Sequence, residues 1–238
     1  KNPGCPAGRE FVVTHGYLVE RRELGISGEQ ARVIAREVSR GCANAALRFM
    51  RIVNLLTATG VPSAEAVKIG QEFGLRTDAE TGAFTLIYEK AFAKDQLDLD
   101  VRSSLSLARS LTSEFKGDIE HAKRDFQEIV SYCKDNRNID MSLTDCGYLA
   151  ARVVKAAERF DGGIGRSFVR LLEFLRQPSG GGLTHKDALR VAEDLAKQGP
   201  VASENFETTY RYATSKQGLG LSSKDAIALA SELSATKK

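Results

Sequence analysis

The fold of this protein is decided by the stretch FVVTHGYLVERRELGISGEQARVIAREV (11–38), which returns near the other end of the sequence as FETTYRYATSKQGLGLSSKDAIALASEL (206–233). The two stretches align without a gap, 195 residues apart. Phe11 meets Phe206, and the segment Leu24-Gly25-Ile26-Ser27 meets Leu219-Gly220-Leu221-Ser222. Self-similarity of this kind is the signature of a repeat protein.

Four interior stretches fit the same frame. When the phenylalanine of each unit is position 0, an aromatic or apolar residue recurs at position 6, except at Lys90. Small residues recur at positions 20 and 24, and an apolar residue recurs at position 27. The unit at Phe49 fits when its loop is three residues shorter. The six units are 35–42 residues apart and begin near Phe11, Phe49, Phe84, Phe126, Phe168 and Phe206.

The pattern within a unit predicts a helical hairpin. Phe168, Leu171, Leu172 and Leu175 have the spacing i, i+3, i+4, i+7, which forms one apolar face of a helix. A break rich in Gly, Asp or Asn follows, and a polar cap residue then precedes the second apolar run. Three of these breaks carry capping-box-like spacing, at Ser27–Gln30, Thr184–Asp187 and Ser222–Asp225. The small residues at positions 20 and 24 allow the second helix to pack closely.

The sequence therefore predicts an all-α fold, a right-handed α-solenoid of about six two-helix repeats. A hairpin of ~40 residues cannot bury its own apolar face, so neighbouring hairpins share one core. We expect one elongated domain over residues 1–238, with the first and last units as caps. The alternative is two three-unit lobes joined near residues 112–124. The aromatic residues at position 6 are expected to form a ladder in the core between units: Tyr17, Tyr132, Phe174 and Tyr212.

This arrangement resembles α-solenoids of the HEAT and tetratricopeptide type. The resemblance covers nearly the whole chain, but it concerns the architecture. The sequence has no Trp, whereas the tetratricopeptide signature contains one. The resemblance thus implies stacked helical hairpins and carries only an analogy about function.

The four cysteines fall into two pairs in the repeat frame. Cys133 ends a first helix and Cys146 begins the second helix of the same unit, so a disulfide between them is expected. Cys5 and Cys42 occupy nearly equivalent places before Phe11 and Phe49, which favours a second disulfide. The alternative is four thiols that pack as small apolar residues. Oxidised pairs would place the protein outside the cytoplasm, in a periplasmic or secreted location.

Composition narrows the possible functions. Apolar residues make up 42% and charged residues 27% of the 238 residues, which is typical of a globular protein. No apolar run approaches the ~18 residues that a membrane span requires. A formal net charge of +3 is too weak to indicate a polyanion partner.

Motifs for catalysis, metals and cofactors are missing or incomplete. His15, His121 and His185 fall at unrelated places in the frame, so we expect no metal centre. The glycine-rich segments DGGIGRSF (161–168) and PSGGGLTHK (178–186) lack a complete phosphate-binding motif, and we interpret their glycines as helix C-caps. Asp95, Asp98 and Asp100 lack the spacing of a calcium loop and are interpreted as a polar loop with a cap. We therefore expect no catalytic residue and no cofactor.

A row of arginines near the N-terminus suggests an alternative function, the binding of a polyanion. Arg32, Arg36 and Arg40 have the spacing i, i+4, i+8, which predicts a basic stripe on one helix face. Glutamates interleave with these arginines, so intrahelical ion pairs would account for them equally well.

Two functions follow as hypotheses. The first is a non-enzymatic module that binds a protein or peptide on the concave face of the solenoid. The second is a nucleic-acid-binding or DNA-repair-like protein that uses the arginine stripe. An enzyme whose site is assembled from several units is a weaker third possibility.

Overall fold

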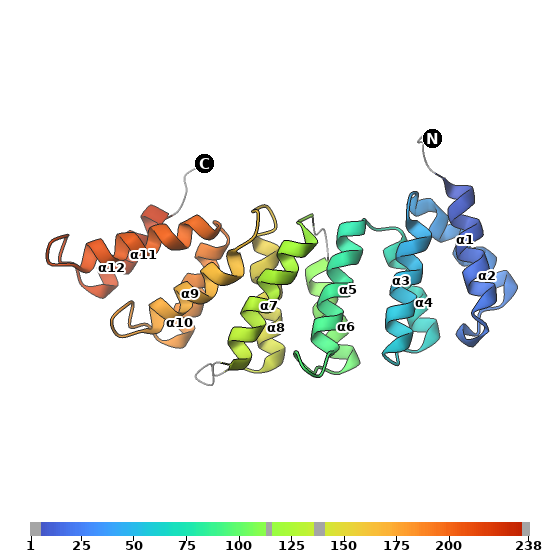
Figure 1. Ribbon diagram of the computed structural model, residues 1–238, viewed down its shortest axis with the longest axis horizontal. Coiled ribbons are helices and arrows are strands. Elements are labelled where there is room, and N and C mark those ends of the chain that lie inside the picture. Colours follow the sequence, from blue (N-terminus) through green and yellow to red (C-terminus); the bar gives the residue numbers. More distant parts are fainter. Residues whose placement is uncertain (1–5, 113–115, 136–140, 235–238) are drawn as a thin grey trace. The chain divides into compact units, whose positions relative to one another are not determined.

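The chain is helical throughout the part that the structure describes. The computed structural model describes residues 6–112, 116–135 and 141–234, and in these ranges it has twelve α-helices, two short 3-10 helices and no strand (Figure 1). This confirms the all-α prediction. The α-helices are α1 (Ala7–Glu20), α2 (Gly28–Val38), α3 (Ala45–Ala58), α4 (Ser63–Gly74), α5 (Asp78–Phe92), α6 (Val101–Thr112), α7 (Ile119–Asp135), α8 (Leu143–Ala156), α9 (Ile164–Arg176), α10 (His185–Ala196), α11 (Pro200–Thr214) and α12 (Ser223–Ser234). The 3-10 helices are η1 (Arg22–Leu24) and η2 (Ser39–Gly41).

Consecutive helices pack in pairs, so each predicted unit is a hairpin (Figure 1). The helices divide into two compact units, with α1–α6 in the first and α7–α12 in the second. Within the first unit, α3 packs against α1 and α5, and α4 packs against α2. Within the second unit, α9 packs against α7 and α11, and α10 packs against α8 and α12. Neighbouring hairpins in each unit therefore stack first helix on first helix and second helix on second helix.

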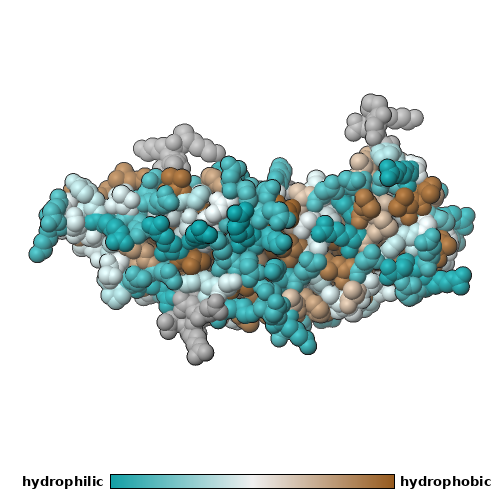
Figure 2. All heavy atoms as spheres, in the orientation of Figure 1, coloured by the Kyte–Doolittle hydropathy of each residue, from teal (hydrophilic) through white to brown (hydrophobic). Residues whose placement is uncertain are grey.

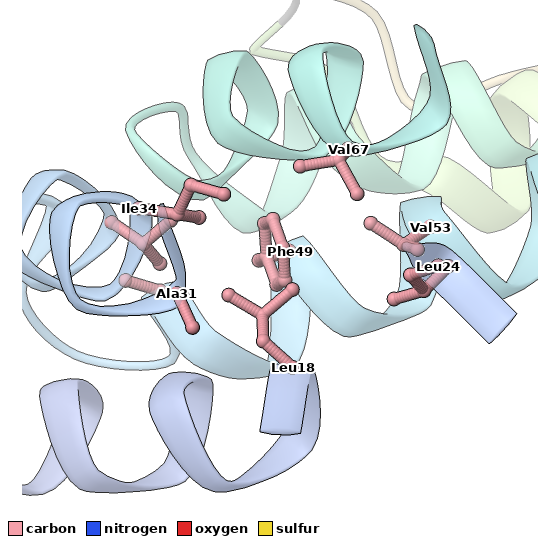
Figure 3. Packing of buried hydrophobic residues seen from close by; sticks show 9 residues of the cluster. Leu18, Leu24, Ala31, Ile34, Phe49, Val53 and Val67 are labelled. Atoms are coloured by element: carbon pink, nitrogen blue, oxygen red, sulfur yellow. The ribbon is translucent and has the colours of Figure 1, made fainter. Parts of the chain in front are cut away.

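The core of the first unit shows why the small positions recur. Phe49 is fully buried and lies among apolar side chains from α1, α2, α3 and α4 (Figure 3). On α4, a Cβ atom added at Gly70 would lie 2.6 Å from Val53 Cγ2 and 3.1 Å from the Phe49 ring. A larger residue at this place would force the two helices apart, because no atom of a packed core can yield that much space.

The phenylalanine anchors are buried in five of the six units: Phe49, Phe84, Phe126, Phe168 and Phe206. Phe11 is the exception and is half-buried. It lies on the first hairpin, and no described helix packs on the other side of α1 to cover it.

The position-6 residues contact the following hairpin rather than forming a continuous buried ladder. The ring of Phe174 is buried and lies perpendicular to Tyr210, with 5.3 Å between centroids. Tyr17 is half-buried and meets Phe49 in the same way at 6.0 Å. Tyr212 is 60% exposed, which corrects the expectation that it lies in the core. It belongs to the last described hairpin and has no following one to contact.

The three predicted caps are present, and the one at α2 is a complete capping box. At the start of α2, Ser27 Oγ accepts from the Gln30 amide at 3.2 Å, and Gln30 Oε1 accepts from the Ser27 amide at 2.8 Å. At α10, the Thr184 hydroxyl accepts from the Asp187 amide at 3.2 Å and donates to the Asp187 carboxylate at 2.8 Å. Ser222 and Asp225 repeat this pair at α12. These caps satisfy amides that a helix leaves free at its first turn.

One turn geometry joins the helices of three hairpins. The residue with a left-handed backbone is Gly182 (φ 60°), Gly220 (φ 62°) or Asp98 (φ 49°). Its amide donates to the carbonyl five residues earlier in each case. Asp98 therefore holds a conformation that suits glycine better, since only glycine adopts it without steric cost.

Candidate functional site

Buried charged residues directly precede three of the phenylalanine anchors, and they join neighbouring hairpins. Glu10 Oε2 accepts from the Ala46 amide at the start of α3, at 2.7 Å. Asp125 Oδ1 accepts from the Gly163 and Gly165 amides at the start of α9, at 3.1 Å each. Neither α3 nor α9 has a cap from its own N-cap side chain. The preceding hairpin therefore supplies the cap.

Asp125 also decides the role of the glycines at 162–165. Gly163 lies at the N-cap of α9, so the prediction that this segment ends a helix was wrong. Amides at a helix N-terminus attract anions, and the carboxylate of Asp125 already occupies them. A Cβ atom at Gly165 would lie 2.5 Å from the Asp125 carbonyl oxygen, so the close approach of α9 to α7 requires glycine there.

Arg48 is the third member of this set. Its buried guanidinium donates to the carbonyls of Ala43, Gly41 and Gly74 at 2.9, 3.0 and 3.1 Å. It also donates to Asp78 Oδ1 at 2.8 Å and thereby lowers the pKa of Asp78. All these charges are used within the fold, so we assign the set a structural role.

The best candidate site is a groove between α7 and α9 in the second unit, which we call the α7–α9 groove. Its volume is about 470 Å³, which falls in the range of ligand-binding clefts. It is lined by Gln127, Glu128 and Ser131 from α7 and by Arg166, Val169, Arg170 and Glu173 from α9.

Two oxygens in the α7–α9 groove have no donor among the described residues. Glu128 Oε1 lies 3.5 Å from Arg166, whose side chain is 82% exposed, while Glu128 Oε2 is buried without a partner. Gln127 Nε2 donates to Ser131 Oγ at 3.0 Å, and Gln127 Oε1 is buried without a partner. A buried acceptor without a donor costs about 1–3 kcal/mol. A ligand that supplied donors at this place would remove that cost.

An ion-pair network joins α9 to α11 and includes Arg170, one of the lining residues of the groove. Glu207 on α11 accepts from Arg170 at 2.6 Å and from Arg211 at 2.8 Å. Burial raises the pKa of Glu207, but the hydrogen bonds from Arg211 and Arg170 outweigh it and lower the pKa overall. The guanidinium of Arg211 also lies over the Phe174 ring, 5.0 Å from its centroid. Arg170 is thus held in place, and Glu128 keeps its unused oxygen.

The structure brings one predicted cysteine pair together. The sulfur atoms of Cys133 and Cys146 lie at disulfide distance, with the Cα atoms 6.2 Å apart. Cys146 is fully buried at position 20 of its unit, where the other units carry alanine or serine. Cys5 lies outside the described residues, so the pair of Cys5 and Cys42 stays a prediction.

The arginine stripe is only partly continuous. Arg32 and Arg36 lie on α2, but α2 ends at Val38, and Arg40 belongs to the separate turn η2. All three side chains are exposed, and none forms an ion pair with a described residue. The intrahelical ion pairs considered for this stripe are therefore absent from the described part of the chain.

The remaining polar motifs have local roles or carry no site. Asp100 accepts from the amides of Arg102 and Ser103 at 2.8 and 3.0 Å, as expected of a cap for α6. Within the ranges that the structure covers, no group of three or more His, Cys, Asp or Glu side chains could hold a metal ion. In the same ranges, no helix has both the length and the apolar character that crossing a bilayer demands.

Sequence reasoning missed the groove and the buried charges. A usable signal existed for the buried charges, because Glu10, Arg48 and Asp125 each stand one residue before an anchor phenylalanine. The groove residues carried no such signal, since polar residues on the outer face of a helix are common in any soluble protein.

Comparison with known proteins adds no assignment: no family model matches the chain, and no curated protein and no solved structure matches it either.

Proposed function

We propose that this protein is a non-enzymatic module that binds a segment of a partner protein in the α7–α9 groove. The observation that supports this function is a pair of buried acceptors, Glu128 Oε2 and Gln127 Oε1, which belong to residues that line the groove and have no donor among the described residues.

The chemistry of the groove specifies the partner segment. The lining has two glutamates and two arginines, and Arg170 is committed to Glu207. The remaining charged residues of the lining are Glu128, Glu173 and Arg166, so their net charge is negative, and Glu128 Oε2 has no donor among the described residues. We expect the partner to place a lysine or arginine side chain against Glu128 and an apolar side chain on Val169. Charge-assisted hydrogen bonds of this kind are roughly twice as strong as neutral ones.

Peptide display tests this function. A random peptide library is selected on the full chain, and enriched peptides are measured by isothermal titration against Glu128→Gln and Val169→Asp. We expect enriched peptides to carry a basic residue and to lose at least ~10-fold in affinity in both variants. Val33→Asp is the matched control, because Val33 is an exposed valine on α2 in the other unit. Enriched peptides that bind the groove variants as tightly as the wild type would refute the proposal.

We also propose that the six hairpins continue as one right-handed α-solenoid. The support is the repeat frame, which runs through all six units with one shortened loop and one exception at position 6, and the same stacking order inside each compact unit. Small-angle X-ray scattering tests the proposal. A single elongated particle agrees with it, and two resolved lobes joined near residues 112–124 would replace it. The same scattering measurement also tests whether the six hairpins form the continuous solenoid that a concave binding face requires.

Nucleic-acid binding remains the second candidate, because the Arg32, Arg36 and Arg40 side chains are exposed and unpaired among the described residues. Three phosphate contacts would give a slope of about −2.7 in a plot of log K against log salt. Fluorescence anisotropy with a labelled DNA duplex measures this slope. Absence of binding at low salt would remove this candidate.

The extracytoplasmic location proposed from the cysteines is tested by intact-mass analysis after alkylation without reductant. Four alkylated thiols would end the disulfide prediction and remove the support for this location.

A further inference from the structure

The last hairpin leaves uncovered a face that every earlier hairpin of its unit buries. Leu219 and Leu233 are 52% and 61% exposed, whereas the aligned residues of the first hairpin, Leu24 and Val38, are 4% and 0% exposed. The residues aligned with Leu233 in the remaining hairpins are all buried: Phe73, Leu111, Val153 and Leu195. Figure 2 shows hydrophobic side chains exposed over α11–α12 and also over α1–α2. The last hairpin therefore presents an apolar face of the kind that normally receives another hairpin.

The first hairpin exposes the complementary face. In the second hairpin, Phe49 and Val53 are fully buried in one apolar cluster with Leu24 and Val38 of the first hairpin, and Figure 3 shows Val53 beside Leu24. Their aligned residues in the first hairpin, Phe11 and His15, are half-buried and stack on each other at 5.8 Å between centroids. Next to them, a Cβ atom added at Gly16 would meet nothing within 4 Å. This face has room for a neighbour.

A polar contact on the second helices sets the register between hairpins. When residues are counted from the anchor phenylalanine of each unit, the side chain at position 26 of one hairpin forms a hydrogen bond or ion pair with the side chain at position 25 of the next in three cases. These contacts are Glu37 with Gln71 at 2.6 Å, Glu72 with Arg109 at 3.3 Å, and Arg152 with Glu193 at 2.8 Å.

At the two outer hairpins, one residue of this contact has no neighbouring hairpin among the described residues to pair with. Glu232 holds position 26 in the last hairpin, and Arg36 holds position 25 in the first. Both are exposed, and neither forms an ion pair with a described residue. Their charges are opposite, as they are in the pairs of Glu72 with Arg109 and Arg152 with Glu193.

We propose that a second copy of this chain docks head to tail, with its first hairpin on the open face of the last hairpin. Leu219 and Leu233 of one copy then pack on Phe11 and the stem of Arg32 of the other. Tyr212 takes the place of Phe174, whose ring lies edge-on against the following hairpin, and it packs over His15 and Gly16. Glu232 pairs with Arg36. This contact is heterologous, so it leads to open chains or closed rings rather than to a two-fold dimer.

The contact lies away from the α7–α9 groove, so peptide binding and self-association can fail independently. In this contact Arg36 binds a carboxylate of the second copy, whereas in the nucleic-acid hypothesis it binds a phosphate.

Sedimentation velocity of the full chain at increasing protein concentration tests the proposal. We expect species larger than the monomer, and we expect Leu233→Asp to weaken association at least ~10-fold, because a leucine that becomes buried is replaced by a charge. Leu75→Asp is the matched control, since Leu75 is 53% exposed and lies outside the proposed contact. Circular dichroism verifies that each variant is folded, and a non-reducing gel identifies copies joined through cysteines.

Exchanging the charges of Glu232 and Arg36 is the most specific test of the proposed contact. Glu232→Arg and Arg36→Glu should each weaken association about threefold, and the double variant should restore it. A chain that stays monomeric at every concentration would overturn the proposal. So would a Leu233→Asp variant that associates as strongly as the wild type, or a double variant no better than the single ones.

Discussion

Removing the carboxylate of Asp125 should loosen the joint between α7 and α9. Asp125 is 3% exposed and accepts hydrogen bonds from two amides at the start of α9, a helix without a cap of its own. Asp125→Ala removes the acceptor and leaves the buried Gly165 amide without a partner. Asp125→Asn keeps an oxygen of the same size and removes only the charge.

The magnitude follows from these contacts. An unsatisfied buried amide costs about 2 kcal/mol, and a carboxylate at a helix N-terminus contributes about 1 kcal/mol through the helix dipole. We therefore expect Asp125→Ala to destabilise the second unit by about 3 kcal/mol and Asp125→Asn by about 1 kcal/mol.

Native-state hydrogen exchange is the sharpest assay, because it reports on the Gly163 and Gly165 amides themselves. A loss of about 2 kcal/mol at one amide corresponds to roughly 30-fold faster exchange. Asp161→Ala is the matched control, since Asp161 is an exposed aspartate just before the same helix. Equal exchange rates at Gly163 and Gly165 in Asp125→Ala and in the wild type would refute the reasoning. An equal acceleration in the Asp161 variant would refute it as well.

Three further predictions concern stability. The double substitution Cys133→Ala with Cys146→Ala should lower the free energy of unfolding by about 3 kcal/mol in a urea titration, because the disulfide closes a loop with a sequence separation of 13. Reductant should bring the urea midpoint of the wild type to that of the double variant. A midpoint that neither change alters would mean that no disulfide forms. Asp98→Gly should raise the free energy of unfolding of the hairpin by about 0.5 kcal/mol, since φ is 49° at this residue; a lower melting temperature would contradict this. Arg48 lowers the pKa of Asp78, so the stability from Asp78 is present above its unfolded pKa of about 3.9 and is lost as the pH falls through the lowered folded value. Urea midpoints measured at falling pH should therefore drop less steeply for Asp78→Asn than for the wild type.

The hairpins were predictable from the sequence because their determinants are local. Capping boxes such as Ser27–Gln30 act within one turn of a helix, and the spacing of Phe168, Leu171 and Leu175 defines one helix face. Alignment of six copies then strengthened each local signal. The position-6 aromatics show the limit of this approach, since Phe174 and Tyr212 occupy equivalent places and yet one is buried and the other is 60% exposed.

The candidate site was not predictable in the same way. Gln127 and Glu128 resemble any polar pair on a helix, and only the packing of α9 against α7 buries one oxygen of each. The sequence likewise suggested that the glycines at 162–165 end a helix. The structure assigns them to the start of α9, where a carboxylate from α7 reaches them.

By itself, the sequence determined that the described part of the chain is helical, that its helices form hairpins, and that the phenylalanine anchors of five units are buried. These properties depend on interactions over a few residues and on a pattern repeated along the chain. Only the tertiary structure decided which polar atoms are buried without partners and which apolar faces stay uncovered. Burial depends on what the neighbouring hairpin contributes, and that neighbour lies about forty residues away in the sequence.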